Sequence, residues 1–170
     1  MKFAYIKARS KHPFPIIAWL IMIFQGEKPW DKNATSHRAL GYWVGETFWI
    51  VDSTGGKGFH DQLFHPVFNR KYWIVDQMDF EMDIDPNDFV EWVEENEGKK
   101  YDRLHVFGLA LKLLGLVSFN TLGRNFKRLT CNEVMVHFMV HFGKLKVKDP
   151  DNWDLNMTDQ MMERMVNHVH

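Results

Sequence analysis

Two strands joined by a two-residue turn place the strongest constraint on this chain of 170 residues. Residues 36–44 and 47–53 flank Gly45-Glu46, and the second stretch is rich in Trp, Ile and Val, a pattern typical of a β-hairpin. If Val44 pairs with Thr47 across the turn, His37 and Asp52 become diagonal neighbours on one face of the hairpin. The hairpin therefore predicts that they can hydrogen-bond, whereas a slip of one residue would separate them onto opposite faces.

The rest of the chain predicts an α+β fold. The apolar run 16–24 indicates a buried helix, although a buried strand fits the pattern too. Loops are expected at 26–35 and 53–58, and an acidic, solvated segment at 76–85. Other strands are expected at 3–8, 63–68 and 71–77, and other helices at 86–97, 102–114, 130–142 and 157–168, with a loop at 117–127. This order suits an antiparallel sheet with helices grouped to one side.

The only cysteine, Cys131, falls where a helix should begin. Thr130 is a good N-cap, and Glu133 follows three residues later, so the pair predicts a capping box. Cys131 would then lie among the unpaired N–H groups at the positive end of the helix dipole, which favours a thiolate. The alternative is a small, buried core cysteine, which is common in proteins.

Composition limits the classes of partner and compartment. A net charge of -1 gives no electrostatic reason to expect nucleic acid, and the longest apolar run is too short to span a membrane. One cysteine excludes an internal disulfide and fits a reducing, cytoplasmic compartment. The length suits a single domain, 1–170, with a core at about 3–142 and a C-terminal helical extension at 150–170.

Together, Cys131, His37 and Asp52 suit thiol chemistry. A thiolate hydrolase needs a nucleophile, a base and a group that orients the base. The three residues meet these needs if the helix lays its N-terminus against the hairpin, where backbone N–H groups could also stabilise an oxyanion. Taken singly, His37 is equally a polar residue at a strand start, and Asp52 a strand-end residue before a turn.

Several motifs resemble the circularly permuted NlpC-type papain-like hydrolases, of which the YiiX-like branch is nearest and the lecithin retinol acyltransferase group a relative. The resemblance rests on the order and spacing of short segments across about residues 3–142. These segments are Ser36-His37-Arg38-Ala39-Leu40 followed by Gly45, then Trp49-Ile50-Val51-Asp52-Ser53, Gly98-Lys99-Lys100-Tyr101-Asp102 and Thr130-Cys131-Asn132-Glu133-Val134. The compact chain also looks like small phage or viral members.

The resemblance implies a permuted papain-like fold with Cys131 as nucleophile, His37 as base and Asp52 as orienter. It assigns Tyr101 and Asn132 to substrate binding or to the oxyanion. The chain departs from the family pattern in three places: Asn132 replaces Ser, Val134 replaces Leu, and Asp52 stands where Glu is frequent. The implied reaction is hydrolysis of an amide, ester or thioester in a small-molecule, peptide or lipid acyl substrate, without a cofactor.

Other patterns carry less weight. His137 and His141 have the spacing of two metal ligands on one helical face, but the zinc-protease glutamate is missing, so no metal is expected. His60 and His65 are expected in loops. Two rival functions remain: a non-catalytic binding or virion-associated protein on the same fold, and a lipid acyltransferase that passes the acyl chain to an acceptor other than water.

Overall fold

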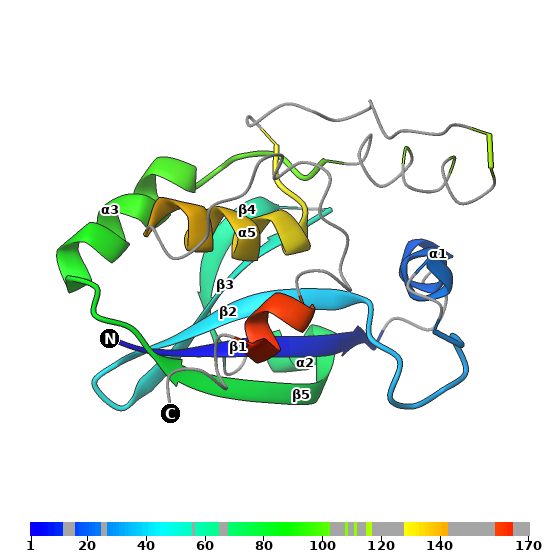
Figure 1. Ribbon diagram of the computed structural model, residues 1–170, viewed down its shortest axis with the longest axis horizontal. Coiled ribbons are helices and arrows are strands. Elements are labelled where there is room, and N and C mark those ends of the chain that lie inside the picture. The colour runs from blue at the N-terminus through cyan, green and yellow to red at the C-terminus, as the bar shows by residue number, and fades with distance from the viewer. Residues whose placement is uncertain are drawn as a thin grey trace.

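The protein is described here by a computed structural model that covers most of the chain (Figure 1). The described residues are 1–11, 16–24, 27–55, 57–64, 68–102, 108, 111, 115–116, 128–142 and 159–164. The named strands are β1 (Lys2–Ser10), β2 (His37–Val44), β3 (Thr47–Thr54), β4 (Gly58–Leu63) and β5 (Tyr72–Glu81). The named helices are α1 (Ile16–Phe24), α2 (Asn69–Lys71), α3 (Pro86–Asn96) and α5 (Cys131–His141).

The strands form one antiparallel sheet in the order β4-β3-β2-β1-β5, so the α+β class is confirmed. The β2–β3 hairpin has the predicted register, because Val44 pairs with Thr47 and Gly41 with Ile50. Its turn contains Gly45 with a φ of 60°, a conformation that glycine adopts without steric cost. The strand pairing on which the predicted contact of His37 with Asp52 depends is therefore confirmed.

Side chains alternate between two apolar clusters on the two faces of the sheet. The larger cluster contains Leu40 and Val51 from the sheet together with residues of α3, α5 and the helical segment 159–164. The smaller cluster contains Ala39, Ile50 and Phe68, with Tyr72 packed against it. By alternation, His37 and Asp52 share the face of the smaller cluster, whereas Arg38 shares that of the larger one.

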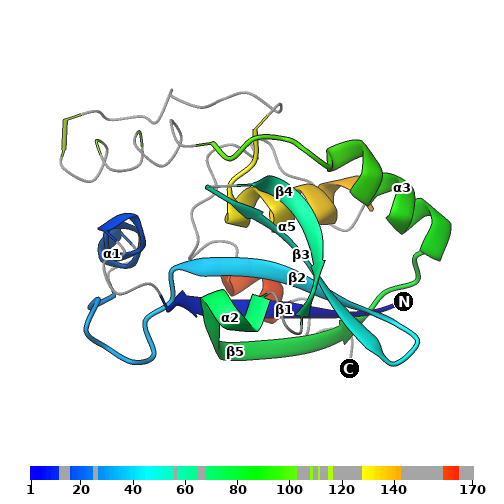
Figure 2. The same ribbon diagram turned by 180° about the vertical axis from the view of Figure 1, so that it is seen from behind.

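The helices lie on different sides of this sheet (Figures 1 and 2). α5 packs against β2 and β3, and α3 packs against β4. The segment 159–164 crosses β1 and β2 on the face opposite α2. α3 starts as predicted, with the Asp85 side chain accepting a hydrogen bond from the Asn87 N–H and Pro86 as its first residue. No helix in the described ranges is long and apolar enough to cross a bilayer.

Three predictions for single segments are wrong. α1 forms, but it is not buried all round: Trp19 is 50% and Ile23 53% exposed. The strand expected at 63–68 is instead β4, which ends at Leu63, because β4 pairs with β3 directly after the Gly-rich turn. The acidic stretch 76–85 is not simply solvated, since β5 extends to Glu81 and the side chains of Phe80, Met82 and Ile84 are buried.

Several expected elements fall mostly on residues outside the described ranges. These are the helix at 102–114, the loop at 117–127 and parts of the last helix at 157–168. Of the last helix, residues 159–164 are described and are helical. Their Met162 side chain is fully buried and belongs to the larger cluster, so this segment packs on the same face as α5.

Candidate active site

Cys131 is the first residue of α5, directly after the N-cap Thr130, and the predicted capping box is present. The Thr130 hydroxyl accepts a hydrogen bond from the Glu133 N–H at 3.3 Å, and the Glu133 carboxylate accepts one from the Thr130 N–H at 2.6 Å. This reciprocal pair satisfies two backbone donors at the end of the helix. The first turn, including Asn132, is buried, so the cap fixes the backbone that carries the thiol.

The segment before α5 is anchored to two neighbouring parts of the molecule. The Leu129 N–H donates to the Lys100 carbonyl at 2.9 Å, and the Ser53 hydroxyl donates to the Leu129 carbonyl at 2.5 Å. Leu129 itself is only 1% exposed. The position of Cys131 therefore depends on β3, the strand that also carries Asp52.

Asp52 lies between two strands that each supply it with partners. His37 Nε2, at the start of β2, is 2.9 Å from Asp52 Oδ2. On the other side, β4 pairs His60 directly with Asp52, and His60 Nε2 lies 3.2 Å from Oδ1. The Gln62 side-chain amide donates to the same oxygen at 3.4 Å. Because Asp52 is fully buried, these contacts replace water around its carboxylate.

The His37 ring also hydrogen-bonds the Cys131 thiol. Its Nε2 already contacts Asp52, which leaves Nδ1 as the nitrogen available to the thiol. Burial alone would lower the pKa of His37, but hydrogen bonds to Asp52 and Cys131 and the charges of both residues raise it to about 9. The imidazole is therefore held as an imidazolium at neutral pH.

The thiol responds in the opposite direction. Burial alone would raise the pKa of Cys131, but the His37 hydrogen bond and charge lower it, as do the backbone N–H and the charge of Arg38. The net pKa of Cys131 lies below that of an ordinary thiol. The arrangement thus favours a thiolate–imidazolium pair, the form in which a cysteine attacks an electrophile.

Aromatic rings fix the plane of the His37 imidazole. Tyr72 stacks on it with ring centroids 4.4 Å apart and planes 9° apart, and Phe68 contacts both rings. Tyr72 comes from β5, so the far edge of the sheet also takes part in the site. Burial first, and then the charges of Asp52 and Cys131, raises the pKa of the Tyr72 hydroxyl above its ordinary value. Tyr72 therefore stays protonated beside the pair.

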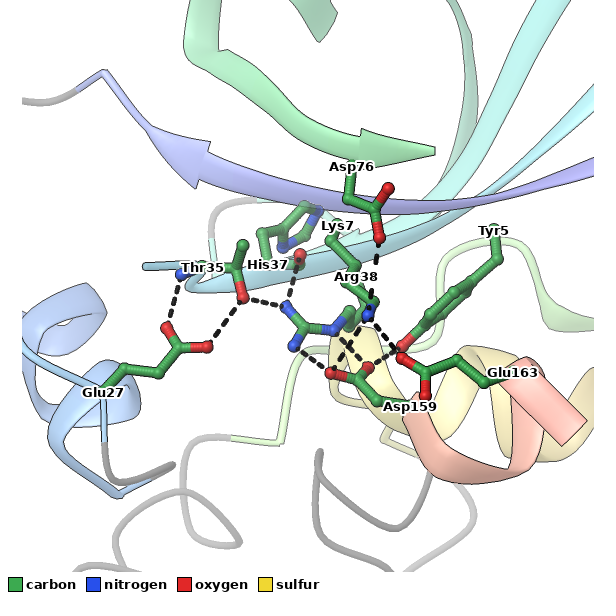
Figure 3. Close-up of polar contacts among 9 residues, drawn as sticks. All are labelled: Tyr5, Lys7, Glu27, Thr35, His37, Arg38, Asp76, Asp159 and Glu163. Carbon is green, nitrogen blue, oxygen red and sulfur yellow. Dashed lines mark hydrogen bonds and ion pairs between the residues drawn. The ribbon is translucent and has the colours of Figure 1, made fainter. Parts of the chain in front are cut away.

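Arg38 supports the other side of the same strand (Figure 3). Its guanidinium forms a two-pronged contact with Asp159, Nε to Oδ1 at 2.9 Å and Nη2 to Oδ2 at 2.8 Å. A further nitrogen donates to the Thr35 hydroxyl at 2.8 Å. Tyr5 donates its hydroxyl to Asp159, and Lys7 lies beside it. Arg38 thereby ties the start of β2 to the helical segment 159–164.

Tyr101 lies within electrostatic range of the thiol. The Tyr101 side chain is half-buried, and burial, followed by the charge of Cys131, raises the pKa of its hydroxyl well above the ordinary value. Cys131 itself is 3% exposed, so a substrate needs an approach lined by residues such as Tyr101. The roles of Tyr101 and Asn132 in substrate or oxyanion binding stay predictions.

Sequence reasoning misplaced one residue and missed others. His60 is not in a loop but on β4 against Asp52, and Gln62 follows two residues later on the same face. Tyr72 and Arg38 were not singled out as site residues. The sequence does contain a signal that could have placed His60. If a strand pairs with β3 directly after the Gly-rich turn, His60 lies opposite Asp52. His65 lies outside the described residues.

Metal binding was tested against the same geometry. Among the described residues, no group of three His, Cys, Asp or Glu side chains could hold a metal ion. His137 is half-buried, and burial, followed by the charges of Lys99 and His141, lowers its pKa.

No family model, curated protein or solved structure matches this chain. What the site can do must therefore be argued from its own contacts. Those contacts bring Cys131, His37 and Asp52 together at the start of β2.

Proposed function

We propose that the protein is a cysteine hydrolase with a Cys131–His37–Asp52 triad on a permuted papain-like fold. One observation carries the proposal: a buried imidazole bonded at once to a buried carboxylate and to a thiol at a helix start. His37 and Cys131 each have a partner that favours the charged form, which is the requirement for a thiolate nucleophile. The β2–β3 hairpin, with the helix start laid against it, agrees with the motif order that suggested the family.

The triad supports an acyl-enzyme reaction. The Cys131 thiolate attacks the carbonyl carbon of an amide, ester or thioester, and the carbonyl π electrons move onto oxygen. In this mechanism, backbone N–H groups in the first turn of α5 stabilise that oxyanion. As the intermediate collapses, the His37 imidazolium gives its proton to the leaving group. Neutral His37 then takes a proton from water while the water oxygen attacks the carbonyl carbon of the thioester. Collapse of this second intermediate breaks the C–S bond, which releases the acid and restores the Cys131 thiolate beside the His37 imidazolium.

Asp52 keeps the base in position during both proton transfers. It accepts a hydrogen bond from the Nε2–H group of His37 and so leaves Nδ1 for the thiol. The Gln62 amide donates a hydrogen bond to its second oxygen, and the His60 ring lies against the same oxygen, so both side chains limit the space in which the carboxylate can rotate. Tyr72 restricts the imidazole plane by stacking. These supports reduce the reorganisation needed between attack and release.

The low exposure of Cys131 favours one rival, a non-catalytic binding protein in which the thiol is only a core residue. Reaction with iodoacetamide at pH 6, followed by intact-mass spectrometry, separates the two. In the hydrolase, Cys131 is alkylated quickly because it is a thiolate. In His37→Ala the rate falls about 10²-fold or more, since an ordinary thiol with a pKa of about 8.5 is less than about 1% ionised at pH 6.

His141→Ala provides the matched control, because this histidine is exposed at the other end of the same helix. Its rate should equal that of the unaltered protein. Labelling at the rate of a free thiol, or labelling only after denaturation, would refute the proposal. A panel of activated esters, thioesters and peptide amides then identifies the substrate bond, by the mass that each adds to Cys131. Transfer of that acyl group to an amine instead of water would identify an acyltransferase.

A further inference from the structure

A cavity of about 440 Å³ lies where three segments meet, one of them the segment that precedes α5. Its lining includes Lys57 before β4, Lys100 and Tyr101 after α3, and Arg128 before α5. The volume falls in the range of small-molecule sites. Tyr101 belongs both to this lining and to the surroundings of Cys131, whose charge raises the pKa of the Tyr101 hydroxyl after the larger effect of burial. Arg128 also lines the cavity and lies three residues before Cys131, so the cavity adjoins the segment that leads to the thiol.

Backbone contacts build one wall of the cavity. The Phe59 N–H donates to the Lys99 carbonyl at 2.8 Å, and the Gly98 N–H donates to the Phe59 carbonyl at 3.2 Å. Gly58 permits this approach, because it has a φ of 78° and a Cβ there would lie 2.1 Å from the Lys99 oxygen. The Leu129 N–H bond to Lys100 joins the segment before the cysteine to the same wall. The lining is thus part of the packed structure.

The charge of the lining is positive. Lys57, Lys100 and Arg128 are all exposed, and none of the described lining residues is acidic. Within the described ranges, none of these three cations makes an ion pair, whereas Lys7 and Arg38 have carboxylate partners. Three cations from separate segments around one cavity repel each other, and a bound anion would relieve that repulsion.

We propose that this cavity binds an anionic group of the substrate, a carboxylate or a phosphate, beside the carbonyl that Cys131 attacks. Arginine and lysine supply the contacts that both groups require, a planar fork from Arg128 and point charges from the two lysines. The cavity's position next to Cys131 rests on the proposed function, but its capacity to attract an anion does not. Acyl compounds without a negative charge would then be poorer substrates.

Two alkylating agents of similar size test this inference. Iodoacetate carries a negative charge and iodoacetamide does not, so the ratio of their rates at Cys131 reports the local charge. Replacing Lys57, Lys100 and Arg128 with Gln should lower the iodoacetate-to-iodoacetamide ratio about tenfold at low ionic strength, and added salt should shrink the difference. The ratio is the quantity to compare, because any change in the thiolate fraction of Cys131 affects both reagents equally.

The control replaces Lys2, Lys28 and Lys32 with Gln, three exposed lysines that do not line this cavity. An unchanged ratio in the cavity variant, or an equal fall in the control, would overturn the inference. Failure of the proposed function would appear differently, as slow iodoacetamide labelling that His37→Ala does not affect. Protection of Cys131 from iodoacetate by inorganic phosphate or by succinate, at constant ionic strength, distinguishes the two anions by the lower concentration required.

Discussion

His37 and Arg38 are neighbours in β2, and each pairs with an aspartate on its own face of the sheet. His37 is 6% and Arg38 1% exposed, and both pairs have contacts of 2.8 to 2.9 Å. Their chemistry differs, because an imidazolium can release its proton near neutral pH and a guanidinium cannot. Similar geometry therefore supports proton transfer at His37 and permanent attachment at Arg38.

The environment strengthens this difference. Burial opposes the charge of Arg38, but the Asp159 hydrogen bonds and the charges of Tyr5 and Asp159 keep its pKa above the already high ordinary value. The pKa of His37 rises only to about 9, where an enzyme can still exchange the proton. We infer that the Arg38–Asp159 pair holds the start of β2 while the His37–Asp52 pair reacts. The two aspartates should then respond differently to the same substitution.

The largest expected effect is on stability. Asp159→Asn leaves a buried guanidinium charged without its carboxylate, and should lower the free energy of unfolding by about 3 kcal/mol. This is the low end for a broken buried pair, because the Asp159 side chain is 18% exposed. Asp52→Asn should cost less, about 1–2 kcal/mol, since His37 can lose its proton when the carboxylate is replaced. Urea unfolding at pH 7.5 measures both, and equal costs would contradict the comparison.

The next effect is on the pH dependence of turnover. Below about pH 9 His37 is an imidazolium, and above the lowered pKa of Cys131 the sulfur is a thiolate, so the reactive pair exists between these limits. Hydrolysis of an activated ester should fall about tenfold per pH unit above 9, where the leaving group loses its acid.

The two aspartate variants test whether the alkaline limb of the pH profile belongs to His37. Asp52→Asn should move the alkaline limb to lower pH, because one of the contacts that raises the pKa of His37 is lost. Asp159→Asn should leave the limb in place, provided that the variant is assayed below its unfolding temperature. An alkaline limb near pH 6.5 in the unaltered protein would show that His37 is an ordinary histidine.

The His37–Asp52 contact could be predicted from sequence because a two-residue turn fixes the register of its own hairpin. The start of α5 could be predicted for a similar reason, since Thr130 and Glu133 form a local sequence motif. In both cases the decisive contacts join residues close in the chain or in adjoining strands. Local rules therefore suffice for these parts of the candidate site.

The remaining contacts could not be predicted by such rules. On β4, His60 and Gln62 are buried against Asp52 and not in an apolar core. The usual alternation of hydrophobic and polar residues is therefore absent from this strand. Arg38 and Asp159 are 121 residues apart, and each alone resembles a solvated surface charge. The apolar run of α1 indicated burial, yet side chains such as Trp19 are exposed, because hydrophobicity does not say which face packs.

The smallest expected effect tests whether β4 is only a support. Gln62 donates a long hydrogen bond of 3.4 Å to Asp52, and its buried Oε1 has no hydrogen-bond partner among the described residues. Gln62→Met keeps the side-chain length while removing a weak bond and an unsatisfied acceptor, two changes that oppose each other. The free energy of unfolding should change by less than about 1 kcal/mol, and the iodoacetamide rate at pH 6 by less than about threefold.

Gln77→Met is the matched control, because the exposed Gln77 also donates to an aspartate, Asp79, at 2.8 Å. It should change neither quantity. If Gln62→Met instead slowed alkylation as strongly as His37→Ala, Asp52 would depend on β4 for its position. The reactive pair would then extend across three strands, and the contrast between a reactive His37 side and a supporting Arg38 side would have to be redrawn around Asp52.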